Sequence, residues 1–266
     1  MSLHGRPSCQ RQRQLLTLIL ACTPVLLQAQ ADPCIPANFD GQVSVRHVID
    51  GDTVVLADGR RLRLVGIDTP ELANDQHPAE PLADQARNFL STLVQQAGPA
   101  LYFVTDREQT DGYGRTLAHL FLPDRSNVQS LILQAGLATP LSVPPNLLFI
   151  DCYRDNTRVA RQAQRGLWDI PGYQVVDVST LQPQERGYRI VRGTVTRIGD
   201  SRTSVWLNLG DGFALRIVKS DIAFFSGLDI SSLHGNTVQA SGELYVRNGQ
   251  LRMRIRHPAD LLVLTE

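Results

Sequence analysis

The chain has 266 residues, a formal net charge of zero, 42% hydrophobic residues and four cysteines. This length is ample for two small domains, and the charge balance excludes a uniformly basic protein. Neither Cys-x-x-Cys nor His-x-x-x-His occurs, which excludes the usual zinc-site spacings. The charge is unevenly divided, since residues 32–185 carry 12 basic and 19 acidic side chains and residues 186–266 carry 11 and 7. The front half is therefore acidic and the back half basic.

Residues 1–31 are typical of a secretory signal. Three arginines precede the apolar run 15–27, and small residues follow up to Ala31, where we expect cleavage. An uncleaved anchor is disfavoured because the run is short and is interrupted by Thr23-Pro24. A lipid anchor at Cys22 is a minor alternative. The mature protein is thus expected in the periplasm or outside the cell, without a stable membrane span.

Three strands are predicted next, over 43–48, 53–57 and 60–67, with Asp58-Gly59 as a hairpin turn. Asp52 and Asp68 follow the ends of the first and third strands, so both carboxylates could face one sheet edge. Two carboxylates, a backbone carbonyl and water would form an open calcium site. The alternative is that each aspartate is an ordinary turn residue. Asp50 is expected to support the site without binding the ion.

Arg61 and Arg63 alternate with leucines, which places both arginines on one strand face. A guanidinium stays charged and can donate two hydrogen bonds to one phosphate. Phosphodiester hydrolysis needs such donors, a divalent cation and a carboxylate that handles the proton of water. Arg63, Arg115, Glu71 and the two aspartates supply that set. Taken singly, each arginine could instead be a solvated strand residue.

The strings 49–53, 63–71 and 110–115 resemble the staphylococcal-type thermonucleases in order, spacing and flanking hydrophobic runs. The resemblance extends from about residue 42 to residue 168 and includes a helix over 127–138 with its stop at Gly136. It implies a mainly β fold with α-helices (α+β), built as a five-stranded OB-like barrel with three helices. It also implies calcium-dependent cleavage of DNA and RNA that leaves 3′-phosphates.

Carried over position by position, the resemblance makes Arg63 and Arg115 the arginines that clamp the phosphate. Glu71 becomes the carboxylate that activates or orients water. The calcium ligands would be Asp52, Asp68 and the Thr69 carbonyl. Where the family has a tyrosine-rich segment that stacks on the base, this chain has residues 141–145 without an aromatic. Tyr113 beside Arg115 either contacts the nucleotide or caps the barrel.

Cleavage of the signal would leave Cys34 and Cys152 as the two cysteines of the exported chain. An oxidising compartment favours a disulfide between them. It would tie the start of the mature chain to the last helix of the thermonuclease-like region, and the closed loop would contribute up to about 4–5 kcal/mol. Two free buried thiols are the alternative.

Composition also predicts the domain boundaries: a nuclease-like domain over 32–173, a linker over 174–187 and a second domain over 188–266. The second domain is expected to contain strands at 189–198, 204–209, 213–218, 237–246 and 251–255 and a short helix at 220–225. The strand count and the strings 191–195 and 233–238 resemble bacterial OB-fold nucleic-acid-binding domains. This resemblance implies a second, smaller OB-like β-barrel.

Arg252, Arg254 and Arg256 alternate with apolar residues, so three guanidiniums share one strand face, with Trp206 and Tyr245 as candidate stacking partners. The alternative is a solvated face with the tryptophan in the core. The whole pattern predicts an exported calcium-dependent endonuclease whose second domain holds the DNA or RNA strand. A non-catalytic nucleic-acid-capturing protein and an envelope interaction protein built on OB barrels are the alternatives. No protein partner is evident.

Overall fold

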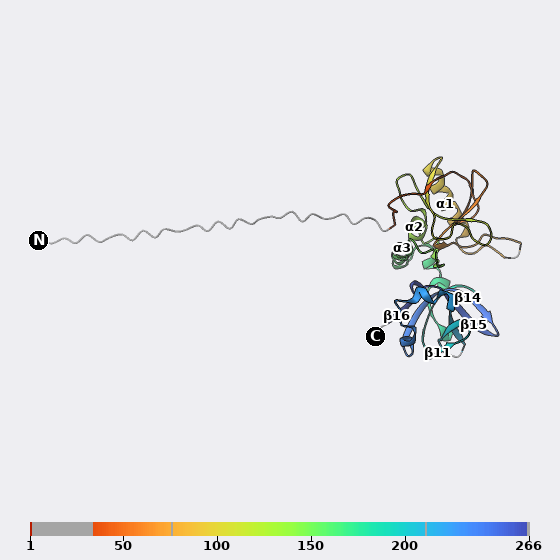
Figure 1. The fold of residues 1–266 in the computed structure, drawn as a ribbon, viewed down its shortest axis with the longest axis vertical. Coiled ribbons are helices and arrows are strands. Elements are labelled where there is room, and N and C mark those ends of the chain that lie inside the picture. Colours follow the sequence, from red (N-terminus) through yellow and green to blue (C-terminus); the bar gives the residue numbers. More distant parts are fainter. Residues whose placement is uncertain (2–33, 76, 211, 265–266) are drawn as a thin grey trace. The chain divides into compact units, whose positions relative to one another are not determined.

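The structure is a computed structural model that describes residues 1, 34–75, 77–210 and 212–264. Beyond Met1, the predicted signal sequence, with Cys22 and Ala31, lies outside the described residues. Within them, two large sheets and three α-helices make up the fold, so the predicted mainly β class with helices is confirmed (Figure 1). None of the helices in this part of the chain is long and apolar enough to cross a membrane.

The first sheet has six strands in the spatial order β1-β6-β7-β4-β3-β2. These strands are β1 (Gly41–Val43), β2 (Val45–Val48), β3 (Thr53–Leu56), β4 (Arg61–Leu64), β6 (Leu101–Val104) and β7 (Thr116–Phe121). The β4–β7 pair is parallel and the other pairs are antiparallel. The predicted single strand over 43–48 is interrupted at Ser44, so its two parts, β1 and β2, occupy opposite ends of the order.

The predicted strand 60–67 is also divided. β4 ends at Leu64, and Ile67–Asp68 forms a separate strand, β5, which pairs with β8 (Thr139–Pro140). Gly66 causes the break: its φ is +86°, and a Cβ there would lie 2.5 Å from the Tyr153 ring. The turn at Gly66 therefore moves Asp68 out of the first sheet and to its edge.

Three α-helices belong to this half: α1 (Ala83–Ala97), α2 (Val128–Gln134) and α3 (Ile150–Gln162). The Asn127 side chain caps α2 by accepting a hydrogen bond from Ser130 N. At the other end, Gly136 has φ +71°, and the amides of Gly136 and Leu137 donate to the carbonyls of Leu133 and Ile132. This is a Schellman C-cap, and it ends the helix before the predicted limit at residue 138.

The first core lies between this sheet and the helices. Its fully buried members include Leu62, Leu64, Leu90, Leu120 and Ile132. Leu62 and Leu64 project inward from β4, which leaves Arg61 and Arg63 on the opposite face, as the alternation predicts.

The second sheet is ordered β11-β12-β13-β15-β14-β10-β9, with β16 paired to β14. Its strands are β9 (Val175–Asp177), β10 (Gly187–Thr194), β11 (Arg197–Asp200), β12 (Ser204–Asn208), β13 (Phe213–Val218), β14 (Thr237–Arg247), β15 (Gln250–Ile255) and β16 (Leu261–Leu264). The five predicted strands are thus present, although the first is divided into β10 and β11. β9 forms within the segment assigned to a linker and pairs in parallel with β10.

Short 3-10 helices complete the chain: η1 (Gly166–Asp169), η2 (Pro171–Tyr173), η3 (Val178–Thr180), η4 (Lys219–Phe225), η5 (Ile230–Leu233) and η6 (Pro258–Asp260). η4 takes the place of the helix predicted over 220–225. A second core fills this half, with Leu215, Ile217 and Met253 among its fully buried members.

The two sheets have the same connectivity. In each, the first strand is divided: β1 and β2 lie at the two ends of the first order, while in the second order β11 lies at one end and β10 lies next to the other end, which β9 occupies. In each, the third and fifth strands pair in parallel, as β4 with β7 and β13 with β15. Helical residues connect the third and fourth strands in both halves, through α1 in the first and through η4 and η5 in the second.

Residues of the two halves also pack together within the compact unit Asp32–Glu266. Ala160 of α3, Trp168 of η1 and Ile190 of β10 form a third buried cluster, with Tyr173 and Tyr188 against it. The rings of Tyr173 and Tyr188 are stacked, with centroids 5.7 Å apart. This cluster fixes η1, η2 and β10 against one another.

Candidate functional site

The Asp50-Gly51-Asp52 turn places a buried carboxylate at the edge of the first sheet. Asp52 N donates to Asp50 Oδ1 at 3.0 Å, and Leu64 N donates to the Asp52 carbonyl at 2.8 Å, which locks the turn to β4. Gly51 has no room for a side chain, because a Cβ there would lie 2.8 Å from Thr69. Asp52 Oδ2 accepts from both the amide (2.9 Å) and the hydroxyl (3.0 Å) of Thr69.

Arg63 links this turn to Asp68. Its side chain is only 12% exposed, and its Nη atoms lie 2.8 Å from Asp52 Oδ2 and 2.7 Å from Asp68 Oδ1. Nη1 also donates to the carbonyls of Leu64 and Ile67, each at 3.0 Å. Two backbone carbonyls and Asp68 therefore accept hydrogen bonds from the guanidinium, and these together with the ion pair to Asp52 hold it in one orientation.

Acidic groups outnumber the arginine at this edge. Burial raises the pKa of Asp52, with Arg63 acting in the opposite direction and Asp50 and Asp68 raising it further. Burial likewise raises the pKa of Asp68. Glu71 is exposed, and its pKa is raised by partial burial and then by Asp50 and Asp68. This excess of carboxylates is an environment that favours a bound cation.

Glu71 begins a loop that closes back on itself. Its amide donates to Glu80 Oε2 at 3.0 Å, and Glu80 N donates to the Glu71 carbonyl at 2.9 Å. Glu80 is thus a fifth carboxylate near the site, after Asp50, Asp52, Asp68 and Glu71. Its place in the sequence, without a neighbouring motif, gave no signal of this role.

Arg115 immediately precedes β7, the strand beside β4. In the parallel register Arg63 lies opposite Leu117, and Arg115 lies two residues earlier, just before β7 begins. Its guanidinium pairs with Asp111 (Nε to Oδ2, 2.7 Å) and lies over the Tyr113 ring. Asp111 also accepts from the amides of Tyr113 and Arg115. The contacts of Arg115 thus lie within its own turn, and among the described residues it forms no ion pair with Asp52 or Asp68.

Tyr113 projects from this turn and is 89% exposed. It contacts Arg115 through its ring and does not belong to the first core. Of the two expectations for this residue, a barrel cap does not fit its exposure, while a contact with a ligand stays open.

Comparisons with known proteins now add to this geometry. Residues 61–170 match the family described as staphylococcal nuclease homologue. The chain is 36% identical over 129 residues to the thermonuclease of Staphylococcus intermedius, an alignment that covers 47% of this chain and 74% of that protein. The chain belongs to the staphylococcal nuclease family. Endonuclease YncB of Bacillus subtilis strain 168 is 31% identical over 135 residues, which cover 49% of this chain and 63% of that protein.

Membership identifies the chain as a nuclease, a hydrolase that acts on nucleic acid. The matched region contains Arg63, Asp68, Thr69, Glu71 and Arg115. In contrast, the comparisons do not assign a family to the second sheet.

Whether the nuclease can hold a metal ion depends on oxygen donors. Among the described residues, no three His, Cys, Asp or Glu side chains form a ligand cluster. Asp52 and Asp68 nevertheless converge on one guanidinium, and the Thr69 backbone lies against Asp52. Carboxylate oxygens are hard donors that suit calcium or magnesium, whereas a closed transition-metal site would need nitrogen or sulfur ligands.

The second sheet of the nuclease presents aromatic and basic side chains on one face. Trp206 lies beneath two guanidinium groups, with Arg252 at 4.6 Å and Arg216 at 5.7 Å from its ring centroid. In the strand register Arg252 lies opposite Tyr245, and Arg254 opposite Arg216. Trp206 is half-buried on this face and is not part of the second core, so the alternative that placed it in the core is wrong.

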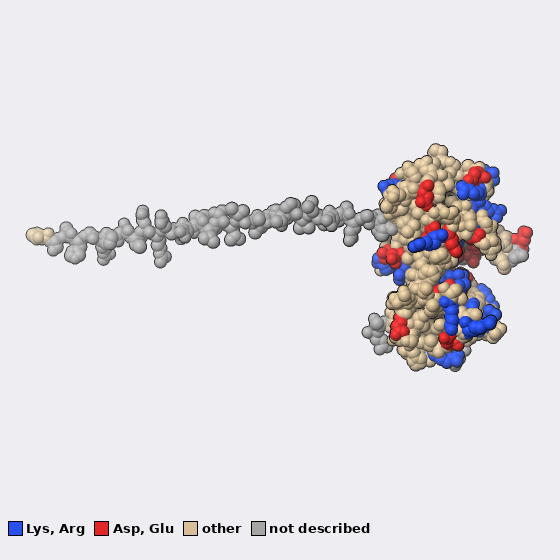
Figure 2. Space-filling model, in the orientation of Figure 1, with Lys and Arg blue, Asp and Glu red and all other residues tan. Residues whose placement is uncertain are grey.

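Figure 2 shows Lys and Arg side chains gathered over β14 and β15. Sequence reasoning named Arg252, Arg254 and Arg256 in this region but missed Arg216 on β13. The alternation of Arg216 with the buried residues Leu215 and Ile217 was a signal that could have identified it.

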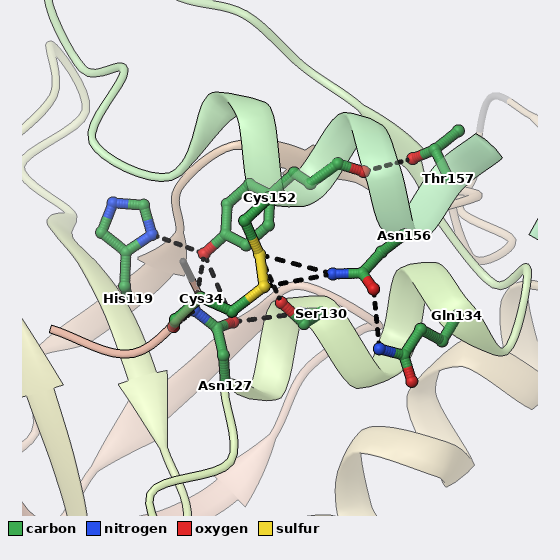
Figure 3. The surroundings of a disulfide bond; sticks show 9 residues. Cys34, His119, Asn127, Ser130, Gln134, Cys152, Asn156 and Thr157 are labelled. Carbon is green, nitrogen blue, oxygen red and sulfur yellow. Dashed lines mark hydrogen bonds between the residues drawn. A yellow bond between two sulfur atoms is a disulfide. The ribbon is translucent and has the colours of Figure 1, made fainter. Parts of the chain in front are cut away.

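The predicted disulfide between Cys34 and Cys152 is present, with a Cα–Cα distance of 5.3 Å. It joins the segment before β1 to α3, the last α-helix of the first half, as expected (Figure 3). Asn156 donates to both sulfur atoms, at 3.3 and 3.4 Å, and Asn127 donates to the Cys34 carbonyl. Cys152 is 2% exposed. The alternative of two free thiols is therefore wrong.

Proposed function

We propose that this nuclease is a calcium-dependent endonuclease that hydrolyses phosphodiester bonds of DNA and RNA and leaves 3′-phosphates. The observation that carries the proposal is the position of Arg63. Its side chain is only 12% exposed, is held by three hydrogen-bond acceptors and is flanked by two carboxylates, and β4 pairs with β7, the strand that Arg115 precedes. Such a rigid cation beside an acidic edge is suited to binding a phosphate together with a metal ion.

Asp52, Asp68 and the Thr69 carbonyl would hold the calcium ion. The donor set fits, because it consists of hard oxygens and because burial raises the pKa of Asp52, so that a bound cation would favour the charged carboxylate. When bound, calcium supplies positive charge that neutralises phosphate oxygens. Once a cation shares the carboxylates, the Nη atoms of Arg63 become available to a phosphate.

The protein residues would divide the reaction between them. Glu71 accepts a proton from the attacking water, or orients that water, as a new P–O bond forms. Arg63 and Arg115 donate hydrogen bonds to the phosphate oxygens as negative charge builds up on them. Arg115 also stabilises the 5′-oxygen as its bond to phosphorus breaks, and a 3′-phosphate remains on the product.

For the second half we propose an OB-type barrel that holds the strand. The shared strand order of the two halves supports this assignment, because a sheet that closes on itself would bring together the two parts of a first strand that is divided between the two sides of the order. The Trp206, Arg216 and Arg252 contacts support nucleic-acid binding, since aromatic rings and guanidiniums are the groups that bind single strands.

We also infer export to the periplasm or beyond the cell. The Cys34–Cys152 disulfide supports this, because such bonds persist in oxidising compartments.

The test is hydrolysis of single-stranded DNA by the chain from Asp32 onward, in calcium and in chelator. Arg63→Ala and Arg115→Ala should each lower turnover by a factor on the order of 100 or more. Arg60→Ala is the matched control, because Arg60 is exposed and pairs with Asp58 in the hairpin turn. A mild loss in both site variants would reject the assignment. Binding in calcium without cleavage would favour the strand-capturing alternative.

A further inference from the structure

A cleft of about 360 Å³ adjoins the candidate metal edge. On one side it is lined by Asp68 and Thr139 of the β5–β8 pair and by Ser142. On the other side it is lined by the second sheet, through Arg216, Glu243, Tyr245, Arg254 and Arg256. The basic face of the second sheet and the carboxylate proposed to bind calcium therefore share one cleft.

The arginines of this wall are held in place by their own sheet. Arg254 Nη2 pairs with Asp221 Oδ2 at 2.7 Å, and Arg216 Nε donates to Ser204 Oγ at 2.9 Å. Arg254 and Arg216 lie side by side in the parallel register of β15 and β13. Arginines fixed in this way lose little conformational freedom when they bind a ligand.

The wall also has hydrogen-bonding groups that lack partners. Arg254 Nε and Tyr245 Oη are buried and have no hydrogen-bond partner among the described residues. Buried donors normally have partners, so these two are candidates for contact with a ligand or water. Burial, and then the neighbouring Arg254 charge, lower the pKa of Arg256. A bound anion would relieve both the unpaired donors and the repulsion between the arginines.

The spacing of these groups indicates an extended polyanion. Arg254 lies in β15 and Arg256 directly after its last residue, so extended backbone would place the two about 7 Å apart. Consecutive phosphates of an extended single strand repeat on a similar scale. A small anion would contact only the arginines of the cleft. A polynucleotide, in contrast, can place one phosphate at Arg63 and further phosphates along these arginines.

We propose that the cleft is a second phosphate-binding subsite, in which Arg216, Arg254 and Arg256 bind the strand whose scissile phosphate lies at Arg63. The second sheet is then part of the substrate cleft, and it gives the nuclease a preference for polynucleotides over dinucleotides. Besides Asp68, two further carboxyl groups lie in the same cleft, Glu243 and Asp260, and the latter accepts a hydrogen bond from Ser142 Oγ at 2.7 Å. This inference rests on the proposed function.

The test compares a 30-nucleotide single strand of DNA with the dinucleotide d(TpT), both in calcium. Arg254→Gln/Arg256→Gln should raise KM for the long strand about tenfold or more and leave kcat/KM for d(TpT) within about twofold. Because this double variant cannot neutralise two of the phosphates, the slope of log KM against log salt should fall by about 1.4. The control is Arg202→Gln/Arg247→Gln, which removes the same charge from the second sheet outside the cleft.

Each outcome is decisive. If the cleft double variant and the control double variant raise KM for the long strand equally, the arginines act only by general electrostatic attraction, and the proposed subsite is overturned. Equal losses on both substrates, with an unchanged melting temperature, would also overturn it. If the double variant fails to fold, Arg256→Gln alone provides the same comparison. Failure of the unsubstituted chain to cleave either substrate would instead count against the proposed endonuclease.

Discussion

The Cys34–Cys152 disulfide should contribute a large share of the stability of the first half. The two cysteines are 118 residues apart in the sequence. The chain-entropy relation assigns a loop of that length about 5 kcal/mol at 25 °C, because the cross-link restricts the unfolded chain. A folded domain has a total stability of roughly 5–15 kcal/mol, so reduction removes much of it.

Urea unfolding of the oxidised and the reduced chain would measure this contribution. With a slope of about 3 kcal/mol per molar urea, the midpoint should fall by roughly 1.5–2 M on reduction. The two tryptophans report on different regions, since Trp168 contacts α3 while Trp206 lies in the second sheet. The closed loop lies within the first half, so fluorescence from Trp206 should show the smaller shift.

The variant Cys34→Ser/Cys152→Ser is the control for chemical reduction. It should unfold at the same urea concentration as the reduced chain, which would separate the cross-link from the packing of the sulfur atoms. A midpoint change below about 0.5 M in both forms would refute the loop-closure reasoning. The unfolded chain would then already be restricted without the disulfide.

Three further predictions concern single residues. Burial lowers the pKa of His119, so the unfolded chain binds a proton more readily. Stability from this group is complete above about pH 6.5 and falls with decreasing pH by up to about 1.4 kcal/mol per unit. His119→Gln should flatten the urea-midpoint profile between about pH 5 and pH 7, and an unchanged profile would exclude His119 as the cause. Gly66→Ala should destabilise the fold by roughly 2–4 kcal/mol, because it combines a left-handed backbone with a clash against Tyr153; a calorimetric loss below about 1 kcal/mol would contradict this. Glu71→Gln should lower turnover roughly 100-fold or more without a change in melting temperature, because Glu71 is exposed. Retained activity would remove Glu71 from the mechanism.

Much of the fold and of the candidate site followed from local sequence pattern. The alternation of Arg61 and Arg63 with leucines assigned the faces of β4 correctly, because strand periodicity is a property of the backbone. Gly136 ended α2, although the helix stops four residues earlier than predicted. The cysteine pairing also followed, because the predicted export left two cysteines.

The contacts between residues that are distant in the chain were decided by the tertiary structure. The strands predicted over 43–48, 60–67 and 189–198 are each divided, and the break in 60–67 comes from the packing of Gly66 on Tyr153, a contact between residues far apart in the chain. The ion pair of Arg63 with Asp52, and the cleft shared by Asp68 and Arg254, join segments whose separation no local pattern encodes. Periodicity determines which face a side chain occupies, whereas packing between the elements determines which groups that face meets.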